Sequence, residues 1–190
     1  METQTAKLTY EQIRQIIIDK CREQSACGSK NNPHDQEFGK LINADTEEGF
    51  WTVIKNNALW AHEHGVISIE ILEKYDIKTL NENNIFIDGG VRNLDKDKCC
   101  INYYGTVSEN NGTVSYNGNN GTVSENYGTV SENSGTVSKN YGTVSKNYGT
   151  VSYNGNYGTV SGNYGTAVVI ERQNKRIYMK NGEFEIVYFE

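Results

Sequence analysis

The side chains of this chain that could do chemistry are three histidines and four cysteines, and the chemistry they suggest is metal binding. His62 and His64 are two residues apart in an expected helix, so they lie about 200° apart around it and cannot both face one ion. The gap between Cys21 and Cys27 is not a zinc-finger spacing. We therefore expect no metal and no cofactor, and we expect histidines that face solvent or pack in a core. The rest of the set is His34, Cys99 and Cys100.

An enzyme is the alternative, with a cleft that holds Asp88, His62 or Cys99. The sequence fixes no Ser-His-Asp or Cys-His arrangement and contains no phosphate-binding glycine loop. An enzyme would need a pocket in which titratable groups converge. We expect a protein without catalytic residues.

Composition limits the classes of partner. The 190 residues carry a net charge of −6, which disfavours a nucleic-acid-binding protein because such proteins usually show a basic patch. The start of the chain lacks the apolar core of a secretory signal, and no apolar run is long enough to span a bilayer. We expect a cytoplasmic protein with reduced cysteines and no membrane partner. Homo-oligomers remain open.

Residues 1–84 have the pattern of a helical domain. Thr9 and Gln12 form a capping box before apolar residues at helical spacing, which predicts a helix over 10–23. A second helix carries Phe38, Leu41 and Ile42. A third begins at the cap Thr46 and stops at Gly65, and a fourth runs from the cap Ser68 to near Asp76. The largest candidates for burial are Trp51 and Trp60.

The array between Tyr104 and Thr166 repeats Gly-Thr-Val-Ser nine times, the last copy being degenerate. Each unit has seven residues and one aliphatic side chain, and its Gly, Thr and Val disfavour helix, so a coiled coil is excluded. Thr-Val-Ser is typical of a strand, with the flanking Gly on one side and the variable residue and Asn on the other in turns. Val points inward, and Thr and Ser point outward.

A single valine buries too little surface to order seven residues, so the units must stack. The simplest closed arrangement has two units per coil and two facing valine columns. The predicted fold class is therefore α+β, with a helical domain (1–84), a two-sided β-solenoid of seven-residue repeats (85–169) and a C-terminal β-hairpin cap (170–190). Ile85–Val91 is the expected start of the solenoid, and Asn181-Gly182 is the expected hairpin turn.

Differences between repeats test this arrangement. Two residues are added after Val114 and after Val151, in Tyr116-Asn-Gly-Asn and Tyr153-Asn-Gly-Asn, which we expect to be loops on opposite edges. Stacking two units per coil places Glu125 beside Lys139 and Glu132 beside Lys146, as exposed ion pairs. The same stacking predicts a ladder of Tyr127, Tyr141 and Tyr157 on one edge.

The array resembles β-rolls with about 14 residues per coil. One group is the grass ice-recrystallisation-inhibition proteins, whose units resemble Asn-Thr-Val-Ser-Gly; here Gly replaces the first Asn, and the fifth position is Glu, Lys, Tyr or Gly. The other is the head of trimeric autotransporter adhesins. The stretch Phe50–Trp60 is similar to uncharacterised proteins of gut-bacterial phages and mobile elements, which bring no known activity.

Three functions follow from these observations. The first is a non-enzymatic interaction protein whose solenoid binds a protein or a glycan, or a host component if the gene belongs to a phage. The second is ice binding through the Thr and Ser columns. The third is a stiff spacer, with the helical domain as a docking or oligomerisation unit. The expected surface binding residues are Tyr116, Asn117, Tyr127, Tyr141, Tyr153, Asn154, Tyr157, Thr129 and Thr143.

Overall fold

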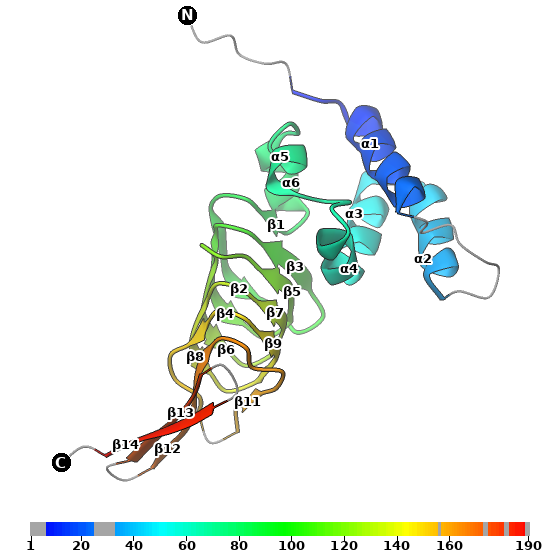
Figure 1. Cartoon of the computed structure of the whole chain (residues 1–190). Coiled ribbons are helices and arrows are strands. Elements are labelled where there is room, and N and C mark those ends of the chain that lie inside the picture. The colour runs from blue at the N-terminus through cyan, green and yellow to red at the C-terminus, as the bar shows by residue number, and fades with distance from the viewer. Residues whose placement is uncertain (1–6, 25–32, 156, 173–174, 181–182, 189–190) are drawn as a thin grey trace, which may run out of the picture. The chain divides into compact units, whose positions relative to one another are not determined.

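The computed structural model describes residues 7–24, 33–155, 157–172, 175–180 and 183–188. The chain divides into two compact units, Met1–Asn83 and Asn84–Glu190. The first is helical and the second is a β-solenoid (Figure 1), so the predicted fold class is confirmed. Among the described residues, no helix has both the length and the apolar character needed to cross a membrane.

The helical unit begins with the predicted helix. Thr9 and Gln12 form the capping box of α1, which buries Ile13, Ile17 and Cys21 on one face. Trp51 and Phe50 are fully buried at the centre of this unit, and their rings meet edge to face at 5.2 Å. The helices of the described residues are α1 (Tyr10–Glu23), α2 (Pro33–Ile42), α3 (Glu47–Asn56), α4 (Ala58–Glu63), α5 (Ile69–Leu72) and α6 (Ile77–Glu82).

Two helix boundaries differ from the prediction. The expected third helix is divided at Asn57, whose side-chain amide donates to the carbonyl oxygen of Val53 at 2.9 Å and so competes with the helical backbone. The fourth helix is short and ends at Leu72, and α6 was not predicted. Asp76 caps α6 by accepting from the Thr79 N–H at 2.8 Å, although Leu80 is its only buried residue.

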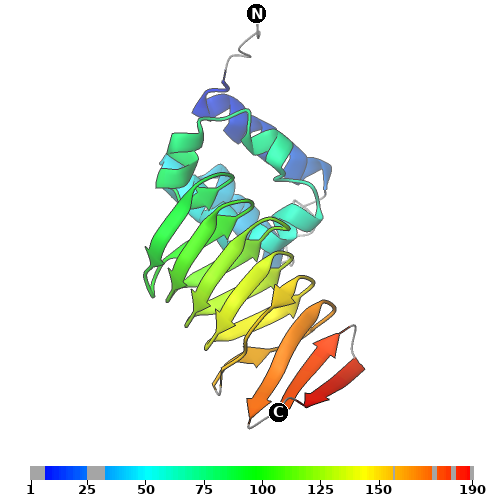
Figure 2. The same ribbon diagram turned by 90° about the vertical axis from the view of Figure 1, so that its left-hand side faces the viewer.

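The solenoid consists of two sheets with parallel pairing throughout the repeats (Figure 2). The six-stranded sheet has the order β1 (Ile85–Phe86), β3 (Cys99–Asn102), β5 (Thr113–Asn117), β7 (Thr129–Asn133), β9 (Thr143–Asn147) and β11 (Thr159–Val160). The eight-stranded sheet runs from β2 (Gly90–Leu94) through β4 (Thr106–Asn110), β6 (Thr122–Asn126), β8 (Thr136–Asn140) and β10 (Thr150–Val151). It ends with β12 (Thr166–Arg172), β13 (Lys175–Lys180) and β14 (Glu183–Tyr188).

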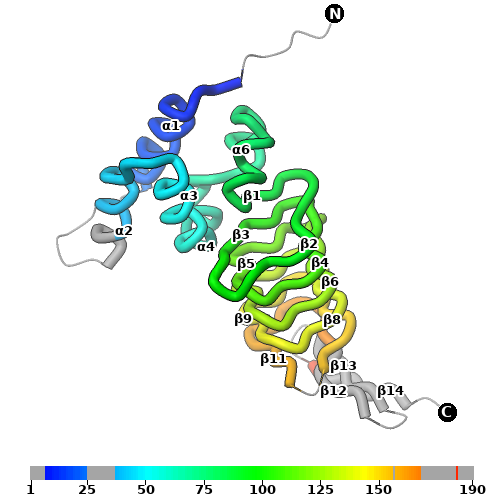
Figure 3. Tube along the Cα trace, turned by 180° about the vertical axis from the view of Figure 1, so that it is seen from behind, coloured from blue at the N-terminus to red at the C-terminus, as the bar shows by residue number. Residues whose placement is uncertain are grey.

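Two units per coil are confirmed by the strand register. Successive repeats alternate between the sheets (Figure 3). Each threonine pairs with the threonine two units away, as Thr122 does with Thr136 and Thr129 with Thr143. Glu125 is in register with Lys139, and Glu132 with Lys146. Val114 and Val151 lie in opposite sheets, as the insertions required.

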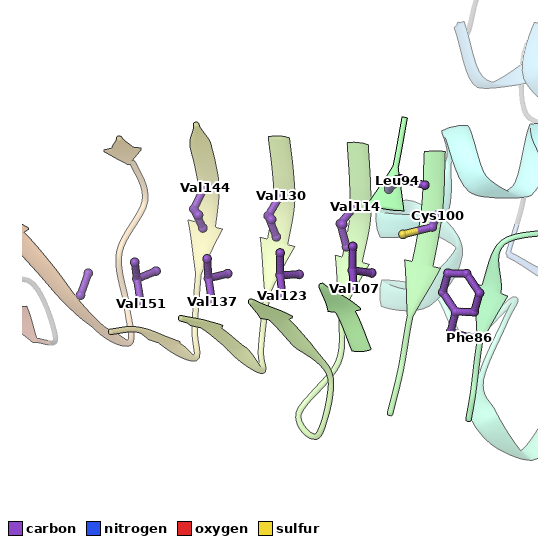
Figure 4. Packing of buried hydrophobic residues seen from close by; sticks show 11 residues of the cluster. Phe86, Leu94, Cys100, Val107, Val114, Val123, Val130, Val137, Val144 and Val151 are labelled. Atoms are coloured by element: carbon purple, nitrogen blue, oxygen red, sulfur yellow. The ribbon is translucent and has the colours of Figure 1, made fainter. Parts of the chain in front are cut away.

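The repeat valines form the solenoid core, with two facing columns between the sheets (Figure 4). Seven of them, from Val107 to Val151, have no exposed surface. Cys100 takes the valine position in β3 and is equally buried, whereas Cys99 is half-buried. The two cysteines therefore face opposite sides of the strand, as successive residues of a strand do.

Asparagines also fill the interior, which corrects the prediction that they lie in turns. The strands β4 to β9 extend to the sixth position of their units, and the Asn at that position is buried in all eight full repeats. Except in the last coil of each ladder, the side-chain amide donates to the amide oxygen of the Asn one coil further along, at 2.5–2.8 Å. One Asn ladder consists of Asn102, Asn117, Asn133, Asn147 and Asn163, and the other of Asn110, Asn126, Asn140 and Asn154.

Both Asn ladders begin above an apolar residue. Phe86 is in register with Asn102, and Leu94 with Asn110. The buried Oδ1 of Asn102 accepts no hydrogen bond within the described residues. In the first coil a large apolar side chain thus takes the place of the ladder asparagine. The strands β1 and β2 confirm the predicted start of the solenoid at Ile85–Val91.

The repeat glycine is required by the close approach of neighbouring coils. A Cβ atom on Gly142 would lie 2.1 Å from the carbonyl oxygen of Gly128, and one on Gly128 would lie equally close to that of Gly112. No side chain fits at these turns.

The C-terminal strands extend the eight-stranded sheet alone. β12 pairs in parallel with β10, and β13 and β14 then add in antiparallel order, which confirms a hairpin. The predicted turn Asn181-Gly182 lies outside the described residues.

Candidate interaction surface

Threonine and serine columns cover the outer faces of both sheets. Because each strand alternates, the fully buried valine places its Thr and Ser neighbours outside. Thr129 and Thr143, both predicted as binding residues, are register partners and are half-buried. The outer face of the eight-stranded sheet has an uninterrupted threonine column of Thr106, Thr122, Thr136, Thr150 and Thr166.

Tyrosines are stacked in pairs along the two edges of the solenoid. The rings of Tyr127 and Tyr141 are 5.2 Å apart and nearly parallel at 11°, which confirms the first step of the predicted ladder. On the other edge, Tyr148 and Tyr164 stack at 5.3 Å and 13°. We call these the Tyr127 pair and the Tyr148 pair. Exposure is 48% at Tyr127 and at Tyr148 and 64% at Tyr164, whereas Tyr141 is half-buried.

The predicted third rung of the ladder is wrong. Tyr157 is 90% exposed, because two added residues precede it and carry it out of the stack. Tyr153 takes its place and meets the Tyr141 ring at 5.9 Å and 62°. A Cβ on Gly155 would lie 2.6 Å from the Tyr141 ring. The inserted turn therefore needs glycine at the position where it passes over Tyr141.

The other insertion repeats this arrangement with a more buried tyrosine. Tyr116 packs on Tyr103 of the preceding coil at 5.4 Å, and burial raises the Tyr116 pKa. Asn117 and Asn154 belong to the Asn ladders. The prediction of these three residues as surface binding residues is therefore wrong, because Tyr116, Asn117 and Asn154 occupy regular fifth and sixth positions in the coil. The exposed part of the 116–119 segment lies at Asn119, followed by Asn120.

Charge on this surface is concentrated at Glu125. Lys139 donates to one carboxylate oxygen of Glu125 at 2.8 Å, and the Tyr127 hydroxyl donates to the other at 3.1 Å. The Lys139 hydrogen bond lowers the Glu125 pKa, and the carboxylate raises the pKa of both Lys139 and Tyr127. This exposed network links the Tyr127 pair to the outer face of the eight-stranded sheet.

The residues considered for catalysis or metal binding are divided between the two units. His62 belongs to α4, where burial lowers its pKa, while the exposed Asp88 accepts from the Gly89 N–H at 2.7 Å in the solenoid unit. The Cys99 sulfur is 2.8 Å from the Ser115 hydroxyl. No cluster of three His, Cys, Asp or Glu side chains suited to a metal occurs in the part of the chain that the structure describes. Cys27 and the His34 side chain lie outside that part.

His64 and Cys21 have separate surroundings within the helical unit. The His64 ring stacks on Trp60 at 4.6 Å. Of the two tryptophans expected to be buried, Trp51 is fully buried and Trp60 is half-buried. Cys21 lines a cavity of about 40 Å³ with apolar neighbours that include Phe38 and Leu41.

Sequence reasoning missed the Asn ladders, although a signal for them exists. All eight full repeats keep Asn at the sixth position, while the fifth and seventh positions vary. An asparagine that is constant among repeats is compatible with a buried, hydrogen-bonded side chain as well as with a turn. Comparisons of the chain with protein-family models, with curated proteins and with solved structures found no match.

Proposed function

We propose that this protein is a non-enzymatic interaction protein whose solenoid presents tyrosine pairs on a rigid frame. The observation that carries the proposal is the stacking of tyrosine rings on both edges, where Tyr127, Tyr148 and Tyr164 are exposed. Tyrosine supplies contact area at a low cost in conformational entropy, and binding surfaces use it together with Asn, Gly and Ser. Stacking restricts each ring further before a partner arrives.

The frame supports this role because it has little freedom to move. Buried Asn ladders and valine columns tie every coil to the next, so the spacing between tyrosines is set by the strand register. Such preorganisation reduces the loss of entropy on binding. The proposed partner is a host protein or glycan. The proposal that this chain belongs to a phage or mobile element rests on the resemblance of Phe50–Trp60 alone.

The test uses the full chain with and without the Tyr148 pair. We would screen immobilised protein against a glycan array and against purified host surface components, and then measure affinity for each ligand found. The double variant Tyr148→Ser, Tyr164→Ser should lose at least tenfold in affinity, while the control Thr122→Ser, Thr136→Ser keeps it. A ligand bound equally by both variants would assign recognition elsewhere and make these edges a spacer.

Ice binding is a second candidate, favoured by the uninterrupted threonine column on the eight-stranded sheet. Ice binding is disfavoured by the charged residues beside this column, which are Glu109, Glu125 and Lys139. A recrystallisation assay on the full chain decides the matter. Inactive native protein excludes ice binding, and activity abolished by Thr122→Lys would establish it.

A further inference from the structure

The two sheets of the solenoid end at different heights. The six-stranded sheet stops at β11, whereas the eight-stranded sheet continues beyond β10 with three more strands. Within the described residues, β12, β13 and β14 therefore have no strand of the other sheet opposite them. The end of the solenoid has the shape of a step that is three strands deep.

The core is less well covered at β11. Val160 of β11 is half-buried, whereas the repeat valines from Val107 to Val151 have no exposed surface. β11 has one neighbour, β9, so its other backbone edge is open within the described residues. Open edges of this kind pair readily with another strand.

The register continues the valine column onto the overhanging strands. Val151 pairs with the buried Ala167, Ala167 pairs with Met179, and Met179 pairs with Phe184. Every register position that extends this column is thus occupied by an apolar residue. An apolar row that continues a core beyond the end of its opposing sheet needs a partner layer.

We propose that the partner layer is the same step of a second copy of this chain, joined about a two-fold axis. This axis relates the eight-stranded sheet of one copy to that of the other. The overhanging strands β12, β13 and β14 of the two copies then face each other. β14 of one copy then lies beside β11 of its partner, at two equivalent sites. Each joined sheet runs from the six-stranded sheet of one copy into the eight-stranded sheet of the other.

The fit is argued from the strand count and the symmetry. A step three strands deep is complementary to itself, and a two-fold contact closes, so it stops further addition of copies. β12 supplies seven residues, and β13 and β14 supply six each; because side chains of a strand alternate between its faces, about half of these positions lie on the side of the partner layer. The proposal goes beyond binding by the tyrosine pairs and does not depend on it.

The test compares two lysine substitutions in β11 of the full chain. Val160 takes the inward valine position of β11 and Thr159 is exposed, so Val160→Lys places a charge in the joint and Thr159→Lys does not. Light scattering and sedimentation should give twice the chain mass for native protein and for Thr159→Lys. Val160→Lys should give the single mass, with an unchanged circular dichroism spectrum.

A measurement on the native chain keeps the proposal testable if Val160→Lys does not fold. Hydrogen exchange of residues 157–162 and of β14 should slow as native protein is concentrated through the micromolar range. A single mass at every concentration, or a dimer that both variants retain, overturns the proposal. So does exchange in β11 and β14 that does not change with concentration.

Discussion

The side-chain amide of Asn126 donates to the amide oxygen of Asn140, one coil further along, at 2.7 Å. The same Asn126 nitrogen donates to the Thr143 carbonyl at 3.2 Å, and both asparagine side chains are fully buried. Neighbouring coils are therefore held by interior hydrogen bonds as well as by the sheets.

Asn126→Asp tests the Asn ladder with a change of very few atoms. The substitution replaces a buried donor by a carboxylate, which must be buried as a charge or protonated, so we expect a loss of at least about 2 kcal/mol in unfolding free energy. Urea denaturation measures it. The control is Asn120→Asp in the exposed turn, which should stay within about 0.5 kcal/mol of the native value. Equal losses in the two variants would contradict the ladder.

Val137→Thr tests the valine columns without a large change in volume. Val137 has no exposed surface, so the introduced hydroxyl lacks water and should cost about 1–3 kcal/mol. The same substitution at the half-buried Val91 should cost clearly less, because solvent reaches that coil. Thermal unfolding of the two variants should rank them in this order, and the reverse order would show that the core is organised differently.

Gly142→Ala and Gly39→Ala should change stability in opposite directions. A Cβ on Gly142 would lie 2.1 Å from the Gly128 carbonyl oxygen, which forces adjacent coils apart. Gly39 lies within α2, where a Cβ meets no atom within 4 Å, so alanine there should stabilise the helix by up to about 1 kcal/mol. Denaturation curves followed by circular dichroism separate the two effects, and a stable Gly142→Ala would argue against the tight coil spacing.

The ion pair between Glu125 and Lys139 predicts a titration shift. Its hydrogen bond lowers the Glu125 pKa below the usual 4.5, so the pair stabilises the fold above that pH and loses its effect as pH falls through the lowered value. Lys139→Gln should raise the Glu125 pKa, as measured by NMR titration of the side-chain carboxyl carbon. Lys146→Gln is the matched control on the other sheet and should leave it unchanged. An equal rise in both variants would refute the assigned register.

The sequence was most informative where one physical effect dominates. Val is the sole aliphatic residue of the repeat, so burial alone decides its direction, and the seven-residue period then sets which threonines pair. The same logic predicted that Glu125 meets Lys139. Capping chemistry placed the start of α1 correctly, because Thr9 and Gln12 act within one turn.

Prediction failed where a polar side chain finds a distant partner. Asn is a common turn residue, but the burial of Asn117 is favourable because it forms hydrogen bonds with Asn102 and with Asn133 on the neighbouring coils. Tyr116 is buried for a similar reason, since it packs on Tyr103 of the preceding coil. Asn57 ends α3 through bonds to Val53 and to Glu37, and the latter lies on another helix. Such partners become visible once the coils are in register.

The Asn ladders also give the solenoid an electrical direction. In both ladders every amide nitrogen points toward the later coil and every amide oxygen toward the earlier one, from Asn102 to Asn163 and from Asn110 to Asn154. Backbone dipoles largely cancel within a sheet, but these side-chain dipoles add. Each added coil lengthens two aligned columns, so the amino-terminal end of the column carries partial negative charge and the carboxy-terminal end partial positive charge. A symmetric-looking stack of identical repeats is thereby polar along its axis.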